Sequence, residues 1–305
     1  MTLAAALSQE PQTVATLRPG QQVDGIFACA RKERQISRAG TPYLTVELRD
    51  RSGTILARAF RDADLLAGRF ERGDLVKVSG RVERFRDELQ VALQAISRAS
   101  DSDADPASFL PATYRDVDEL DGFLEHLARE VYQPGLKALL ESLLGDDLLR
   151  SQIRRAPCTL PPNAPGRFAH HAYLGGLLEH TVAVATMALE LCTLHPRLDR
   201  DLLVCAAIVH DLGKTREFTY GAEIALSEEG RMLGHVELGL RIIAAHMPTS
   251  LEAERRLALE HCVITHHGSE AGSSQRFASP EAQALYRLNA LDVQVKAVLE
   301  HGFTR

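Results

Sequence analysis

The stretch RDLLVCAAIVHDLG, residues 200–213, decides the fold of the second half of the chain. Its apolar run predicts a helix that is buried on most of its surface, and the run ends on an adjacent His-Asp pair and a glycine. A buried imidazole or carboxylate without a partner costs several kcal/mol. His210 and Asp211 therefore predict either a helix end satisfied by local hydrogen bonds or a functional site.

The same pattern recurs on other helical segments of residues 114–305, where titratable side chains interrupt apolar runs. One such histidine is ordinarily a satisfied core residue, but helices of a bundle can each project one ligand into a shared interior site. Mixed imidazole and carboxylate ligands suit Mn, Fe, Co, Ni or Zn better than Mg or Ca. The interrupting residues are His180, His210, Asp211, His235, His266, His267 and Asp292.

In residues 12–98 the apolar residues recur with a different periodicity. Five short segments alternate apolar with polar residues and are separated by turn signals such as Asp50-Arg51-Ser52-Gly53, which predicts a small closed β-barrel. Residues 99–113 are polar and contain two prolines, so they are interpreted as a linker. The predicted fold class is multidomain α+β, with an N-terminal barrel at 12–98 and an all-α helical bundle at 114–305.

Composition indicates an ordinary globular protein of two domains. The 305 residues are 45% hydrophobic and 25% charged, and no stretch approaches the roughly 18 uninterrupted apolar residues of a membrane span. The five cysteines are scattered without CxxC spacing, which predicts reduced thiols and a cytoplasmic location. Residues 12–100 hold 16 Lys and Arg against 11 Asp and Glu, although the net charge is −6. A basic first domain and an acidic second domain favour a polyanion-binding part and a metal-binding part.

Several quoted stretches carry a family resemblance: FAHHAYLGGLLEHT (168–181), LLVCAAIVHDLGKTREF (202–218), GRMLGHVELG (230–239) and ITHHGSEAGS (264–273). Their order resembles the HD-domain metal-dependent phosphohydrolases that hold two metals. More narrowly, it resembles bacterial 3′→5′ exoribonucleases of the YhaM type, which also carry an N-terminal OB-fold. The chain departs from that pattern at Ser274, where a proline is expected, and no GYP triplet follows the His-His-Gly run.

The resemblance implies two divalent ions, with Mn²⁺ expected and Co²⁺, Fe²⁺, Ni²⁺ or Zn²⁺ as alternatives. One ion would be held by His180, His210, Asp211 and Asp292, and Asp211 would bridge to a second ion held by His235 and by His266 or His267. A carboxylate has two oxygens and can span two cations, whereas an imidazole normally binds one. We expect His266 to be the ligand and His267 to contact the phosphate or a ligand, but adjacent residues cannot be separated from sequence.

Further residues are assigned to catalysis or to substrate. Lys214 is expected to contact the non-bridging phosphate oxygens, or else to be an exposed helix-end lysine. Arg167, His170 and His171 are candidates for binding the scissile phosphate, the alternative being a loop histidine pair without a role. In the barrel, a basic and aromatic set is expected to hold single-stranded RNA or DNA, unless it is only a solvated hairpin. This set is Arg31, Lys32, Arg34, Arg38, Tyr43, Arg58, Phe60, Arg84, Phe85 and Arg86.

Three functions compete. The first is a 3′→5′ exonuclease that trims single-stranded RNA, and single-stranded DNA as a further substrate, to nucleoside 5′-monophosphates. The second is a nucleotide or small-molecule phosphohydrolase whose barrel serves oligomerisation. The third is a non-catalytic nucleic-acid-binding protein with structural metals. The family also implies a homo-oligomer and no membrane partner.

Overall fold

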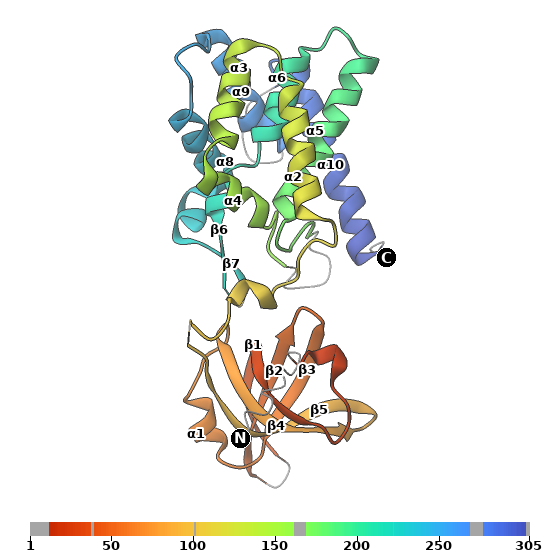
Figure 1. Cartoon of the computed structure of the whole chain (residues 1–305), viewed down its shortest axis with the longest axis vertical. Coiled ribbons are helices and arrows are strands. Elements are labelled where there is room, and N and C mark those ends of the chain that lie inside the picture. Colours follow the sequence, from red (N-terminus) through yellow and green to blue (C-terminus); the bar gives the residue numbers. More distant parts are fainter. Residues whose placement is uncertain are drawn as a thin grey trace, which may run out of the picture. The chain divides into compact units, whose positions relative to one another are not determined.

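The computed structural model describes residues 12–37, 40–100, 102–161, 169–221, 223–268 and 277–302. The chain divides into two compact units (Figure 1). The first holds the described residues up to Leu110 together with 220–223, and the second holds the rest. The predicted fold class, a β-barrel followed by an all-α domain, is confirmed.

The first unit is a closed five-stranded barrel in the order β1-β2-β3-β5-β4. All neighbouring strands are antiparallel except β3 and β5, which are parallel. The apolar positions of the alternating segments point inward, and Phe27, Leu44, Leu48 and Ile96 are fully buried in the barrel core. Its elements are β1 Gln22–Ile36, β2 Pro42–Asp50, β3 Gly53–Ala59, α1 Ala63–Ala67, β4 Leu75–Phe85 and β5 Glu88–Arg98, with 3₁₀ turns at Val14–Thr16 and Pro106–Phe109.

The second unit is a helical bundle. Side chains of Asp116, Asp146, Asp199, Ser227 and Ser279 accept backbone N–H groups at the first turns of their helices, which fixes where these helices begin. Its helices are α2 Val117–Arg129, α3 Pro134–Leu144, α4 Asp147–Arg155, α5 Gly176–Leu194, α6 Arg200–Val209, α7 Lys214–Glu217, α8 Glu228–Ala245, α9 Ala253–Thr265 and α10 Pro280–His301.

Helix α6, the apolar run that opened the sequence analysis, is the centre of the bundle. Its residues Leu202–Val209 are all buried, and it packs against α5, α9 and α10. A helix that is apolar all round is expected in a core, so the prediction for this stretch is confirmed. A short hairpin that the periodicity did not predict, β6 Phe218–Tyr220 and β7 Ile224–Leu226, separates α7 from α8.

Helix α5 is the one helix in the described ranges that is long and apolar enough, by length and composition, to span a membrane. Glu179, His180 and Glu190 interrupt this run, so it is not one of the uninterrupted apolar spans that the sequence analysis excluded. In the structure 56% of this segment is buried, and its apolar run carries the buried side chains of Glu179 and His180. Its apolar character is therefore that of a core helix, which meets other helices on most sides.

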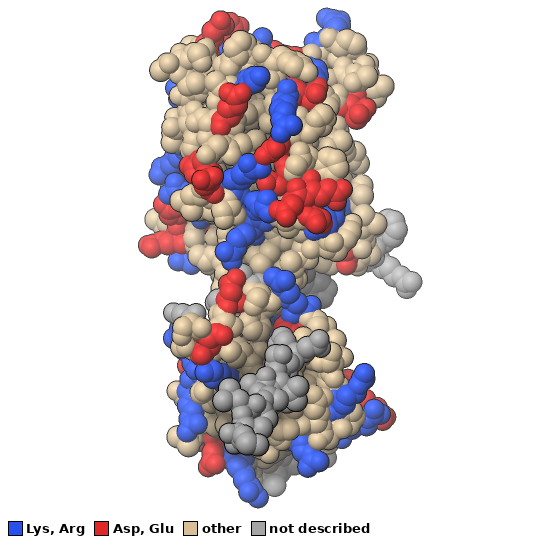
Figure 2. Space-filling model, viewed as in Figure 1, with Lys and Arg blue, Asp and Glu red and all other residues tan. Residues whose placement is uncertain are grey.

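Acidic and basic side chains are interspersed on the surface of the helical unit and do not form one patch of a single sign. Figure 2 shows acidic and basic side chains side by side on the visible face of the bundle. Arg150 and Arg154 pair with Asp121, for example, at 2.7 Å each. The acidic excess of this half is thus partly neutralised locally, and charge alone does not mark the site.

Candidate metal centre

His210 and Asp211 lie where α6 ends. His210 is the C-cap residue, Asp211 follows in the turn, and both side chains are buried. Gly213 lets α8 approach this turn, because a Cβ there would lie 1.8 Å from the carbonyl oxygen of His235. Gly234 has φ 71°, a conformation that favours glycine, and it kinks α8 immediately before His235. Two glycines therefore set the backbone positions that bring His235 to the His-Asp pair.

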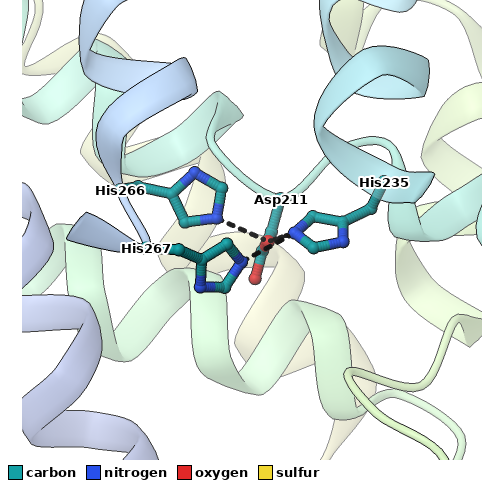
Figure 3. A group of neighbouring side chains, drawn as sticks. All are labelled: Asp211, His235, His266 and His267. Atoms are coloured by element: carbon teal, nitrogen blue, oxygen red, sulfur yellow. Dashed lines mark hydrogen bonds and ion pairs between the residues drawn. The ribbon is translucent and has the colours of Figure 1, made fainter. Parts of the chain in front are cut away.

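The carboxylate of Asp211 stands between two pairs of imidazoles. Its Oδ1 lies 3.4 Å from Nε2 of His266 and 3.5 Å from Nε2 of His235. Its Oδ2 lies 3.4 Å from Nε2 of His180 and 3.3 Å from Nε2 of His210. Figure 3 shows the Oδ1 side, where imidazoles from α8 and from the end of α9 point toward the carboxylate. One carboxylate thus offers each oxygen to a different pair of nitrogens.

Two of these imidazoles are anchored through Nδ1 to backbone carbonyls of their own helices. Nδ1 of His210 lies 2.9 Å from the oxygen of Ala207, and Nδ1 of His266 lies 2.6 Å from the oxygen of Val263. A carbonyl oxygen only accepts, so Nδ1 carries the proton in both rings. Nε2 of each ring is thereby turned toward Asp211.

The other two imidazoles are anchored through Nδ1 to carboxylates. Nδ1 of His180 lies 2.6 Å from Oδ2 of Asp292, and Nδ1 of His235 lies 3.2 Å from Oε1 of Glu217. A carboxylate that accepts Nδ1–H fixes the tautomer and orientation of a metal-binding histidine. In all four rings Nδ1 is held by an acceptor, and Nε2 is turned toward Asp211.

This arrangement leaves buried polar atoms without protons to share. Among the described residues, Oδ1 of Asp211 and Nε2 of His266 are buried and have no hydrogen-bond partner. Nε2 of His180 and Nε2 of His210 face each other at 3.2 Å. Burial lowers the pKa of His266 to about 4 and that of His180 well below its usual value, so both are neutral at pH 7. Converging lone pairs around a carboxylate fit divalent transition ions.

Lys214 is buried, so the alternative of an exposed helix-end lysine is wrong. Its Nζ lies 2.7 Å from Oδ2 of Asp211 and 3.3 Å from Sγ of Cys158. Burial disfavours the ammonium, but the adjacent Asp211 carboxylate raises the pKa of Lys214 above its usual value. Burial likewise disfavours the Asp211 carboxylate, whose pKa Lys214 and His210 nevertheless hold well below its usual value. The two groups form a buried ion pair.

His267 lies on the Oδ1 side together with His266. Its Nε2 is 2.8 Å from Nε2 of His235, and its ring centroid is 4.0 Å from that of His266. Burial lowers the pKa of His267 to about 2, so this ring is also neutral. The structure thus brings both adjacent histidines to the cluster that contains Asp211 and His235.

Asp292 lies on the other side of His180 from the rest of the cluster. Its contact is with Nδ1, whereas Nε2 of the same ring faces His210 and Asp211. The group of mutually close ligand atoms from His180, His210 and Asp211 does not include Asp292, which groups instead with His171 and His180. Asp292 was expected to bind a metal directly; in the structure its carboxylate contacts Nδ1 of His180, and its role as a metal ligand stays a prediction.

Three residues that precede α5 in the chain were predicted to bind substrate, and the structure describes two of them. Arg167 lies outside the described residues. His170 and His171 are buried, their Nδ1 atoms are 3.2 Å apart, and each ring centroid is 5.5 Å from that of His180. Burial lowers the pKa of His170 to about 2 and that of His171 to about 3. Both are therefore neutral neighbours of the cluster and are not exposed cations.

The predicted basic residues of β1 are paired within the barrel. Nε of Arg31 lies 2.7 Å from Oε1 of Glu33, and Nζ of Lys32 lies 2.9 Å from Oε2 of Glu71. Arg34 binds Asp64 with Nε and Nη2, at 2.5 and 3.1 Å. A phosphate would have to displace an acidic side chain at each of these positions.

The aromatic residues of the barrel are more accessible. The rings of Tyr43 and Phe60 stack with centroids 5.3 Å apart, and Phe60 is 58% exposed. Phe85, at the end of β4, is 47% exposed, and the guanidinium groups of Arg58 and Arg86 lie 5.5 and 5.3 Å from its ring centroid. The exposed face of the barrel thus offers rings and cations together.

Sequence reasoning missed several residues around the cluster. Glu217 and Cys158 contact His235 and Lys214, and Asn289 donates from Nδ2 to the carbonyl oxygen of His266 at 3.3 Å. No spacing rule marks them, because each acts across the fold. Glu179, next to His180, is buried and pairs with Lys296 at 2.6 Å.

The fold and the cluster define the class of this protein. A family model described as HD domain matches residues 177–295, and one described as OB-fold nucleic acid binding domain matches residues 30–98. The chain therefore carries an OB-fold domain followed by an HD domain, and it is a metal-dependent hydrolase.

Individual relatives agree with this class. The chain is 27% identical to the 3′-5′ exoribonuclease YhaM of Bacillus velezensis over 279 residues, which covers 90% of this chain and 86% of that protein. The resemblance found in the sequence is thereby confirmed. Similar solved structures include the second OB-fold domain of replication protein A from Methanococcus maripaludis (18% identity, 30% of this chain and 96% of that one, TM-score 0.25). A small single-stranded DNA-binding protein from Streptomyces coelicolor is also similar (19% identity, 27% and 95% covered, TM-score 0.23).

Proposed function

We propose that this protein is a 3′→5′ exonuclease that hydrolyses single-stranded RNA, and single-stranded DNA as a further substrate, to nucleoside 5′-monophosphates. The observation that carries the proposal is the division of imidazoles between the two oxygens of Asp211. A relative that is an exoribonuclease, similar over both halves of the chain, supports the choice of substrate. Five buried, unpaired cysteines support a cytoplasmic location.

The residues present would hold two divalent ions with Asp211 between them. His180 and His210 would bind on the Oδ2 side, and His235 and His266 on the Oδ1 side, with His267 next to them. When bound, such a pair supplies an activated water and neutralises charge on the phosphoryl group. Nitrogen and oxygen donors suit Mn, Fe, Co, Ni and Zn alike, and the family resemblance makes Mn²⁺ our expectation for both ions.

The remaining side chains hold the ligands in their reactive form. Asp292 and Glu217 keep the protons of His180 and His235 on Nδ1, so that Nε2 stays free. Lys214 keeps Asp211 ionised and fixes Oδ2. We therefore assign Lys214 to positioning of Asp211, in place of the phosphate contact expected from sequence. His267 is the better candidate for a contact with the scissile phosphate, because it lies at the cluster and is only partly buried.

The barrel would hold the strand chiefly through aromatic stacking. Phe60 on Tyr43, and Phe85 between Arg58 and Arg86, are suited to stack unpaired bases, and the guanidinium groups can meet the backbone. Arg31, Lys32 and Arg34 can join only by exchanging carboxylate partners for phosphates. Affinity for the strand is then expected to fall with salt, because phosphate contacts release counterions.

The test is incubation of a 5′-labelled single-stranded RNA with the full chain and Mn²⁺. We expect a ladder of shortened labelled products and release of nucleoside 5′-monophosphates. Asp211→Asn, which keeps the size of the side chain, is expected to abolish the ladder. Asp147→Ala, which removes an exposed aspartate of α4, is the matched control and is expected to keep it.

Each alternative has its own outcome. An intact RNA together with turnover of mononucleotides would replace the proposal with a small-molecule phosphohydrolase. Binding of the RNA without any hydrolysis, for a preparation that contains stoichiometric metal, would replace it with a binding protein.

A further inference from the structure

Cys158 differs from the other four cysteines in what its sulfur contacts. Those four lie in the apolar cores of the two units, where a thiol serves as a small apolar side chain. They are Cys29, Cys192, Cys205 and Cys262. Cys158 is equally buried, but Nζ of Lys214 donates to its Sγ at 3.3 Å, and Oδ2 of Asp211 lies 3.9 Å from the same sulfur. Apolar packing alone therefore does not account for a thiol at this position.

The backbone holds Cys158 beside a pair of histidines. The N–H of Cys158 donates to the carbonyl oxygen of His171 at 3.0 Å. The hydroxyl of Thr159 donates to the carbonyl oxygen of His170 at 2.9 Å and accepts from its N–H at 3.2 Å. His171 has φ 50°, which is uncommon for a residue with a side chain, and such a conformation persists where the surrounding contacts hold it. The sulfur thus has a fixed place next to the two imidazoles.

The sulfur and two imidazoles are spaced as metal ligands are. One ligand atom from each of Cys158, His170 and His180 lies within 4.8 Å of the others, and all three side chains are buried. His180 belongs at the same time to the group that it forms with His210 and Asp211. Both His180 and His210 turn Nε2 toward Oδ2 of Asp211, the oxygen that the sulfur also approaches. Cys158 therefore lies on the Oδ2 side of the centre.

The two sides of Asp211 offer different donors. The Oδ1 side, drawn in Figure 3, combines the carboxylate with imidazoles of His235, His266 and His267 and contains no sulfur. Among the described residues, Cys158 is the one cysteine that belongs to a group able to hold a metal ion. Thiolates select softer ions such as Zn²⁺, whereas Mn²⁺ suits oxygen ligands. Two ions bound on the two sides would thus meet different chemistry.

The charges on the Oδ2 side are compatible with a thiolate. The ammonium of Lys214 contacts both Sγ of Cys158 and Oδ2 of Asp211, at 3.3 and 2.7 Å. A nearby cation favours the ionised form of an acidic group, and here Lys214 and the bound ion would together balance the thiolate and the carboxylate. The proton of the thiol is released to solvent when the ion binds, as for other cysteine ligands.

We propose that Cys158 is a sulfur ligand of the ion on the Oδ2 side, and that this side selects Zn²⁺ over Mn²⁺. The inference rests on the metal centre proposed above and refines it. The family resemblance gives Mn²⁺ for both ions, and the sulfur changes that expectation for one of them. The centre would then hold two unlike ions, with Zn²⁺ on the Oδ2 side and Mn²⁺ on the Oδ1 side.

The first experiment uses Co²⁺ as the probe, because its absorption spectrum reports a bound sulfur. The full chain is stripped of metal with a chelator and titrated with Co²⁺. The wild type is expected to develop a near-ultraviolet band from charge transfer between sulfur and cobalt, for one of the two bound ions. Cys158→Ala is expected to bind Co²⁺ without this band, and Cys158→Ser, which keeps the volume of the side chain, is a second variant with the same expected result.

Cys192→Ala is the matched control, because it removes a buried thiol of α5 that lies outside the group. It is expected to keep the band, and circular dichroism verifies that all variants are folded. A wild type that binds two Co²⁺ ions without the band would overturn this inference and leave the proposed exonuclease intact, and so would a band that survives in Cys158→Ala. A wild type that binds no Co²⁺ would overturn both, because the metal centre itself would be absent.

The second experiment measures selectivity by competition of the full chain with a chromophoric chelator, for Zn²⁺ and for Mn²⁺ separately. Cys158→Ala is expected to lower the Zn²⁺ affinity of one site by at least about 10–100-fold, which is the range for loss of even an outer partner of a ligand. The Mn²⁺ affinity is expected to fall by less than about tenfold, because Mn²⁺ gains little from a thiolate. Equal losses for the two ions, or no loss for either, would overturn the proposed selectivity.

Discussion

The two units of this chain treat charge in opposite ways. In the helical unit, most side chains of the cluster are buried and held by partners inside the fold, as His180 is by Asp292. In the barrel, exposed basic side chains pair with acids on the same surface, as Arg34 does with Asp64. Buried groups keep a geometry because no solvent competes with their partners, whereas exposed pairs are exchangeable. The cluster in the helical unit is thus preformed, whereas the contacts on the barrel surface can exchange partners.

The largest effect is expected from Asp211→Ala. It removes the carboxylate shared by both pairs of imidazoles and leaves the Lys214 ammonium buried without its partner. Breaking a buried pair in this way costs about 3–5 kcal/mol, so we expect loss of hydrolysis and of stability together. Urea unfolding measures the second effect. The double variant Asp211→Ala, Lys214→Met should recover stability but not hydrolysis, and recovery of both would contradict the preformed site.

Metal removal is the next test. Ions that bind only the folded chain stabilise it by about 2.7 kcal/mol when the free metal is at 100 times its Kd. Chelation should therefore lower the melting temperature and remove the activity, and added Mn²⁺ should restore both. The isolated barrel offers the internal contrast, because none of its described residues belongs to a cluster that could hold a metal ion. Equal melting with and without chelator in the wild type would count against the buried centre.

A smaller loss is expected from Asp292→Asn and Glu217→Gln. Each weakens the acceptor of one Nδ1–H, and changes of this kind cost about 10–100-fold in metal affinity or activity. Isothermal titration with Mn²⁺ should show lower affinity with the number of bound ions unchanged. If Asp292→Asn instead binds one ion fewer than the wild type, Asp292 is a metal ligand, as the sequence resemblance implied.

The smallest effects belong to the barrel. Phe60→Ala and Phe85→Ala should each weaken binding of single-stranded RNA by about 1–3 kcal/mol, which is the range for loss of one stacked base. Arg34→Ala should change it by less than about 1 kcal/mol, since its guanidinium is engaged by Asp64. Fluorescence anisotropy with labelled RNA measures both. If Arg34→Ala weakens RNA binding more than Phe60→Ala does, the salt-bridged cations contribute more to binding than the exposed rings, and the expected order is wrong.

Much of the fold was predictable because it follows from the periodicity of apolar residues and from the polar residues that interrupt apolar runs. Alternating apolar residues gave the barrel strands, and histidines within apolar helical runs marked the residues that the structure gathers around Asp211. The unpredicted parts depend on contacts between distant residues. Nothing local places Glu217 on Nδ1 of His235, turns Asp292 to the outer nitrogen of His180, or buries Lys214 beside Cys158. The pairing of Arg34 with Asp64, thirty positions apart, is equally invisible before folding.

Gly213 limits which substitutions this chain can accept during evolution. The half of the centre that holds His235 comes close to the half that holds His210 because one position has no side chain. An alanine at position 213 would push the kinked helix α8 outward. His235 would then move away from the carboxylate of Asp211. Substitutions that preserve every ligand can therefore still silence the enzyme, and the smallest residue in the motif is among its least replaceable.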